Sequence, residues 1–162
     1  MGARFDKHTL KRELEEALAA DAETLERAQR SAVDAATHEE AKPENDKDTR
    51  ALEASYLARG HALRLEELRT ALAELRAWAP AESAQKVATG ALGAIVTAED
   101  EDGERVYFLA PHGGGQRLAE GRVHVVTPKS PLGRALLGKT AGDEAELKVE
   151  GRVRTLAITG VA

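Results

Sequence analysis

The chain has 162 residues, of which 42% are hydrophobic and 31% are charged, so it has enough apolar material to fold. It has no cysteine, which excludes disulfides, a thiolate nucleophile and cysteine-ligated zinc. Its net charge is -5 and neither half has an excess of basic residues, which argues against direct, sequence-specific binding of nucleic acid. Because no stretch resembles a signal peptide or a membrane span, we expect a cytoplasmic protein without membrane contact.

Two segments in the first half, residues 8–36 and 49–78, have a composition that favours helix, being rich in Ala, Leu, Glu and Arg. Each would be roughly 40 Å long, and a short connection makes neighbouring helices antiparallel. We therefore predict that residues 1–79 form an antiparallel two-helix coiled-coil hairpin. Its predicted apolar stripe, with spacings of three and four, consists of Leu14, Leu18, Ala22, Leu25, Ala28, Ala32 and Ala35, facing Leu65, Leu68, Leu72 and Leu75.

The predicted connection, residues 37–48, is strongly acidic. Pro43 disfavours helix and should end the first helix nearby, and Asn45 is one of the residues that could cap the second. The ordinary interpretation is a solvated turn whose acids cap a helix and complement its dipole. The carboxylates that gather at this end of the hairpin are Glu39, Glu40, Glu44, Asp46 and Asp48.

The second half, residues 80–162, has short runs of Val, Thr and Ile between turn signals, which indicate a small antiparallel β-sheet with one short helix. The predicted fold class is therefore α+β, a helical hairpin followed by a sheet domain. Glu150 and Gly151 are expected to form a two-residue hairpin loop. The expected strands are residues 91–97, 105–109, 122–126, 145–149 and 153–158.

The short helix has clear sequence signals at both ends. Ser130 is a predicted N-cap, Pro131 a predicted first helical residue, and Gly138 a predicted left-handed C-terminal cap. Residues 133–140 also match the phosphate-loop pattern GxxxxGK[ST], but that pattern must open a helix to point its N–H groups at phosphates. Here it coincides with the end of a helix, so we interpret the match as coincidental.

Residues 112–115, His-Gly-Gly-Gly, are predicted to form a turn between strands rather than a metal or phosphate site. A serine-nucleophile motif GxSxG is absent from the sequence. We expect no metal to be bound stably by this chain alone, because metal-ligand spacing is lacking among its five histidines, His8, His38, His61, His112 and His124.

The segment Ser130–Lys139 reads Ser-Pro-Leu-Gly-Arg-Ala-Leu-Leu-Gly-Lys and is followed by Gly142-Asp143. It resembles the C-terminal domain of the bacterial GreA/GreB transcript-cleavage factors, which carry a similar segment and turn. Glu44-Asn45 resembles part of the family's tip sequence, Gly-Asp-x-x-Glu-Asn. The resemblance implies an FKBP-like sheet domain that docks on bacterial RNA polymerase, and a helical finger that enters the polymerase's secondary channel. The docking residues that it implies are Ser130, Pro131, Arg134 and Lys139.

The resemblance also implies a role for the acidic tip. Glu40 and Glu44 would assist the polymerase's catalytic Mg²⁺, and thereby activate water to cut backtracked RNA, because hard carboxylate oxygens suit this ion. Catalysis would belong to the polymerase, so the chain is expected to be an accessory factor, not an enzyme, with no cofactor of its own, and to be a monomer. The remaining tip residues would be Glu39, Asn45, Asp46 and Asp48.

The tip differs from the family pattern, because three residues rather than two separate Glu40 from Glu44, and one of them is Pro43. Stimulated cleavage and non-cleaving occupation of the channel therefore both remain open. An FKBP-type prolyl isomerase is a further alternative, but its pocket needs aromatic lining, and Tyr107 and Phe108 should lie on opposite faces of a strand. The last alternative is an adaptor whose hairpin dimerises through an exposed stripe.

Overall fold

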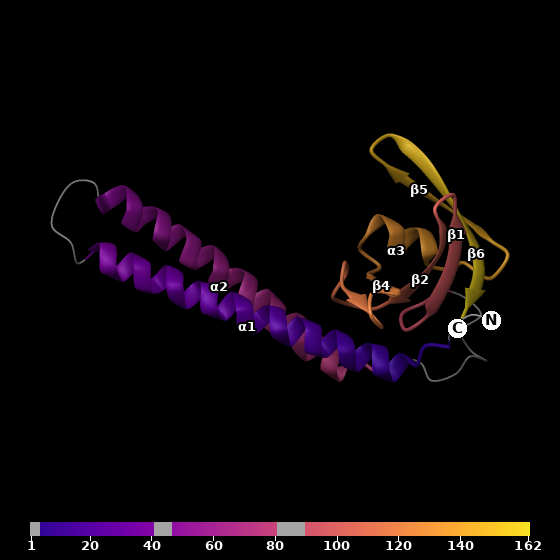
Figure 1. The fold of residues 1–162 in the computed structure, drawn as a ribbon, viewed down its shortest axis with the longest axis horizontal. Helices are drawn as coiled ribbons and strands as arrows, with labels where there is room; N and C mark the ends of the chain where they lie inside the picture. The colour runs from indigo at the N-terminus through magenta and orange to yellow at the C-terminus, as the bar shows by residue number, and fades with distance from the viewer. Residues whose placement is uncertain (1–3, 41–46, 81–89) are drawn as a thin grey trace. The chain divides into compact units, whose positions relative to one another are not determined.

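The computed structural model describes residues 4–40, 47–80 and 90–162 (Figure 1). Two compact units are present, one formed by residues 1–16 and 74–162 and the other by residues 17–73. The predicted domain boundary between residues 79 and 80 stays a prediction. The elements in chain order are α1 (Lys7–Glu40), α2 (Lys47–Ala77), β1 (Ile95–Asp100), β2 (Gly103–Leu109), β3 (Arg117–Leu118), β4 (Val123–Val126), α3 (Pro131–Leu136), β5 (Glu144–Val149) and β6 (Arg152–Val161).

The unit of residues 17–73 consists of antiparallel parts of α1 and α2, which confirms the predicted helix pair (Figure 1). An ion pair between Glu26 and Arg69, 3.3 Å long, links the two helices. The predicted stripe is wrong at Ala35, which is exposed, whereas Ala36 is buried. Both spacings, three and four, are compatible with one helix face, and here the stripe continues from the buried Ala32 by four residues to Ala36.

The described residues of the other unit form a six-stranded sheet in the order β3-β4-β2-β1-β6-β5. The expected antiparallel arrangement holds for every pair except β2 and β4, which run parallel. The connection of residues 110–122 allows this reversal, because it is long enough to bring β4 back beside β2 in the same direction. It also contains the two-residue strand β3, which is too short to leave a pattern in the sequence.

The predicted hairpin loop at Glu150 and Gly151 is confirmed. Val149 and Arg152 are paired at the ends of β5 and β6, so that two residues form the loop. Glu150 has φ of 49° and Gly151 has φ of 77°. Positive φ at both central positions is typical of the type I′ turn, whose twist matches that of the strands it joins.

The two faces of the sheet bury different side chains. On one face, Tyr107 and Leu109 belong to an apolar core that includes Leu136 of α3. On the other face, the ring of Phe108 lies 6.1 Å from that of Trp78, and Phe108 is fully buried. Tyr107 and Phe108 therefore lie on opposite faces, as predicted, and do not line one aromatic pocket together.

Candidate functional site

The predicted docking residues lie on α3 and the turn that follows it. Ser130 is the N-cap, because its hydroxyl oxygen accepts a hydrogen bond of 2.9 Å from the Gly133 N–H. The same hydroxyl donates to the Thr127 carbonyl, 2.8 Å away. Pro131 follows as the first helical residue, where its missing N–H costs nothing. The predicted N-terminal signals of this helix are thus confirmed.

Two glycines allow close approach around α3. A Cβ on Gly133 would lie 1.8 Å from the Thr127 carbonyl oxygen, and one on Gly90 would lie 2.2 Å from the Leu136 carbonyl oxygen. Gly138 has φ of 76°, which confirms its predicted left-handed conformation, but the C-cap of α3 is Leu137, in an extended conformation, so the prediction that Gly138 is the cap is wrong. The Gly138 N–H donates to the Gly90 carbonyl at 2.8 Å instead of to α3. The backbone on both sides of α3 is therefore held against neighbouring chain segments.

The two basic residues of the predicted docking set lie at different positions along this segment. Arg134, which is exposed, donates from its guanidinium to the Lys129 carbonyl, 3.1 Å away. Lys139 follows the helix, and its carbonyl accepts from the Gly90 N–H at 2.7 Å. Leu137 between them is 36% exposed. The structure thus brings the four predicted docking residues together around a helix of six residues, with one partly exposed leucine among them.

The Gly142-Asp143 turn after α3 is closed by the Asp143 carboxylate, which accepts hydrogen bonds from the Thr140 N–H at 2.8 Å and the Thr140 hydroxyl at 2.9 Å. These bonds favour the charged carboxylate and lower the pKa of Asp143 below its usual value. Thr140 is also the last residue of the phosphate-loop pattern. The pattern forms a helix end followed by this turn, so its backbone does not have the phosphate-loop geometry.

The predicted tip cannot be placed in the same way. Glu40 is the last residue of α1, and Asp48 lies in the first turn of α2. The side chains of Glu39, Glu40 and Asp48 lie outside the described part of the chain, as do all of Glu44, Asn45 and Asp46.

Among the described residues, no group of three or more His, Asp or Glu side chains has a geometry able to hold a metal ion. His112, in the predicted turn between strands, instead lies 2.5 Å from a carboxylate oxygen of Glu74. In the same described part of the chain, no helix combines the length and the apolar character that crossing a membrane requires.

The sequence analysis missed the pairing of Tyr107 with His124. These residues are register partners on the parallel strands β2 and β4, with ring centroids 6.0 Å apart. Their pairing depends on the parallel arrangement, and the alternation of apolar residues in each strand gives no sign of it.

Comparisons with known proteins agree with the resemblance. A family model described as the C-terminal region of the transcription elongation factors GreA/GreB matches residues 85–162. A curated relative, transcription elongation factor GreA of Cereibacter sphaeroides, is 33% identical over 98 residues, which are 60% of this chain and 62% of the relative. The GreA of Halorhodospira halophila is 38% identical over 71 residues, 43% of this chain and 42% of that protein. The chain thus spans less than two thirds of the length of these relatives.

A solved structure, GreA factor homolog 1 of Thermus thermophilus, is 17% identical, and the match covers 91% of this chain and 94% of that one with a TM-score of 0.39. The fold of this chain is an N-terminal helix pair followed by a mixed sheet with one short helix. Residues 85–162 of this chain are thus similar to the C-terminal region of the GreA/GreB transcription elongation factors.

Proposed function

We propose that this chain is a transcription elongation factor that binds bacterial RNA polymerase through its sheet domain and presents its acidic helix connection to the polymerase's active centre. The observation that carries the proposal is the GreA/GreB match of residues 85–162, which includes the whole Ser130–Lys139 segment. The curated relatives are named transcription elongation factor GreA. The proposed factor is accessory, acts as a monomer, and leaves catalysis to the polymerase.

The proposed docking contact is the α3 surface. Pro131 and Arg134 are exposed there, and Leu137 contributes apolar area. A rigid, partly apolar surface with a guanidinium at its centre suits a protein partner, because arginine and apolar groups are typical of the buried parts of interfaces. The backbone contacts of Gly90 and Gly133 would keep this surface in one conformation during docking.

The proposed role of the tip depends on Glu40 and Glu44. Their carboxylate oxygens are the ligands that Mg²⁺ prefers, and the ion would be the polymerase's own, engaged in trans. Cleavage requires placement to within about 0.5 Å, and the additional residue between the two glutamates changes their relative position. That spacing favours a second candidate function, a regulator that occupies the channel without stimulating cleavage.

The test separates docking from tip chemistry. Purified chain is mixed with bacterial core polymerase, and binding is measured by co-elution at micromolar concentration. RNA cleavage is then followed on a stalled, backtracked elongation complex. The compared proteins are the intact chain, the variant Glu40→Ala/Glu44→Ala, and the matched control Glu23→Ala/Glu66→Ala, which removes two exposed carboxylates of α1 and α2 away from the tip.

If the factor stimulates cleavage, the tip variant should lose at least about tenfold of the stimulation, while binding and the control variant stay unchanged. If the factor only occupies the channel, the intact chain should bind, inhibit nucleotide addition and give no cleavage. Failure of the intact chain to bind core polymerase would refute both candidates.

A further inference from the structure

A second candidate site lies in the sheet-containing unit beside the proposed docking surface, with which it shares Ser130, and its ligand chemistry does not depend on binding to polymerase. It is a surface cavity of about 590 Å³, a volume within the usual range of roughly 300–1,000 Å³ for small-molecule sites. Strands β2 and β4, the 112–115 loop, the turn before α3 and α3 itself all contribute to its walls. Six of its lining residues carry the argument: Tyr107, Gly114, His124, Thr127, Lys129 and Leu132.

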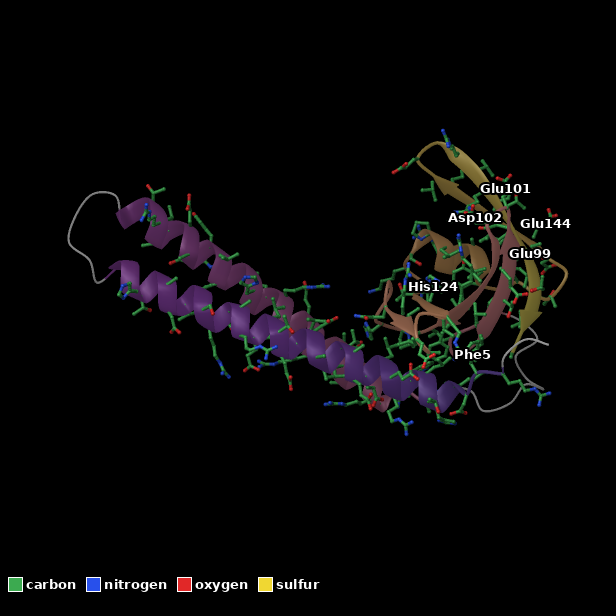
Figure 2. All side chains as sticks on the ribbon, viewed as in Figure 1. Phe5, Glu99, Glu101, Asp102, His124 and Glu144 are labelled. Atoms are coloured by element: carbon green, nitrogen blue, oxygen red, sulfur yellow. The ribbon has the colours of Figure 1, made fainter. Side chains whose placement is uncertain are left out.

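The floor of the cavity is fixed by the parallel strand pair. Tyr107 is 4% exposed, and its ring centroid lies 6.0 Å from that of His124, which is labelled in Figure 2. Gly114 closes one wall, because a Cβ there would lie 3.2 Å from the Thr127 methyl group. The neighbouring Gly115 N–H donates to the Val125 carbonyl at 3.0 Å, which attaches the loop to β4. The cavity is therefore built from ordered backbone on both sides.

The described lining of the cavity carries the Lys129 ammonium and no carboxylate, although the chain as a whole is negative. None of the described residues that line the cavity is acidic, and two of them, His124 and Lys129, are basic. Arg117 on β3 is the register partner of His124, so its side chain lies on the same face of the sheet. Within the described part of the chain, neither Lys129 nor Arg117 forms an ion pair with a carboxylate.

Burial lowers the pKa of His124 most, and the charges of Arg117 and Arg105 lower it further. The Tyr107 ring on β2 lies beside the His124 ring, and Lys129, in the turn after β4, lines the same cavity. Arg105 is itself paired with the carboxylates of Asp100 and Asp102, at 3.5 and 3.2 Å, whereas Arg117 has no carboxylate ion pair in the described part of the chain. A bound anion would counter this repulsion and favour the protonated imidazole, so the affinity for an anion should rise as the pH falls.

We propose that this cavity binds a small organic phosphate, with the phosphoryl group toward His124 and Lys129 and the organic part toward Tyr107 and Leu132. A phosphate monoester carries close to two negative charges at neutral pH, which matches a site with several cations better than a single carboxylate does. The Thr127 hydroxyl would donate a hydrogen bond to the phosphoryl group. The Ser130 hydroxyl does not do so, because it already donates to the Thr127 carbonyl and accepts from the Gly133 N–H as the N-cap. Leu132 and the aromatic rings supply the apolar part of the site.

The experiment uses the full, isotope-labelled chain and two-dimensional NMR. Inorganic phosphate, adenosine monophosphate, adenosine and succinate are titrated separately at pH 6.5 and pH 8.0, and the shifts of the cavity backbone amides and the His124 ring are followed. Lys129→Gln removes one cation of the site and His124→Gln removes the titrating group. Lys148→Gln is the matched control, because Lys148 is also exposed but lies on β5.

Adenosine monophosphate should shift the cavity signals saturably, and more tightly at pH 6.5 than at pH 8.0. Lys129→Gln should weaken this binding at least about tenfold, which is the loss of one charge-assisted hydrogen bond, and Lys148→Gln should not. His124→Gln should remove the tighter binding at pH 6.5, and leave only the weakening that protonation of the phosphate, whose second pKa is about 6, causes at that pH. The proposal is overturned if the cavity signals stay unmoved by either phosphate, if succinate or adenosine binds as well as adenosine monophosphate, or if Lys129→Gln binds like the unaltered chain.

Discussion

Gly133→Ala and Gly60→Ala make the same chemical change in two helices and should have opposite effects. Alanine is a better helix former than glycine by about 1 kcal/mol, so helix propensity alone predicts stabilisation at both positions. At Gly60 in α2, a Cβ would meet no atom within 4 Å. Gly60→Ala should therefore stabilise the helical unit by about 0.5–1 kcal/mol.

At Gly133 the new Cβ would lie 1.8 Å from the Thr127 carbonyl oxygen, whereas real contacts of this kind are longer than 3.0 Å. Backbone must then move by about 1 Å, which costs about 1–3 kcal/mol in a packed site. The same movement stretches two hydrogen bonds to that oxygen, from the Ser130 N–H at 3.0 Å and from the Ser130 hydroxyl at 2.8 Å. At about 1 kcal/mol for each bond, the net destabilisation after the propensity gain is about 3 kcal/mol.

The assay is urea unfolding of the full chain, followed by two probes. The fluorescence of Trp78, the single tryptophan, reports on the sheet unit because its ring lies 6.1 Å from Phe108. Circular dichroism at 222 nm reports mainly on the long helices. Gly133→Ala should lower the midpoint of the fluorescence transition, and Gly60→Ala should raise that of the helical signal. If Gly133→Ala is as stable as the unaltered chain to within 0.5 kcal/mol, the close approach of α3 to Thr127 is wrong.

Two further variants test the turns of the sheet unit by the same urea assay. Asp100→Asn should destabilise the sheet unit by about 2 kcal/mol, because the Asp100 side chain is 2% exposed and forms an ion pair with the Arg154 guanidinium at 3.0 Å. The control is Glu101→Gln at the adjacent turn, where Glu101 and Asp102 are labelled in Figure 2; Glu101 is exposed, so this change should alter stability by under about 0.5 kcal/mol. Equal effects of the two variants would contradict this reasoning. Asp143→Asn should make the free energy of unfolding fall less steeply in acid. The Thr140 hydrogen bonds lower the pKa of Asp143, so the contribution of this carboxylate to stability is complete above the ordinary pKa of 3.8 and is lost as the pH falls through the lowered pKa. An unchanged dependence of stability on pH in acid would count against this role.

The features that the sequence predicts well are those that neighbouring residues determine. The N-terminus of α3 follows from the Ser130 hydroxyl and the Pro131 ring, and the left-handed conformation of Gly138 follows from its being glycine, although the C-cap itself is Leu137. The loop at Glu150 and Gly151 follows from a two-residue spacing between strands. In each case the residue types themselves favour the cap or turn conformation, so that neighbouring residues in the sequence are enough to predict it.

The parallel pairing of β2 with β4 could not be predicted in this way, because it is decided by how residues 110–122 cross from one strand to the other. The assumption that neighbouring short strands pair antiparallel is reasonable, but for β4 it places His124 beside the wrong residues. Only the parallel register brings His124 beside Tyr107, and only the antiparallel β3 then adds Arg117. The cationic cavity is therefore a product of topology. The predicted docking segment is local in sequence, and for that reason it could be identified before the fold.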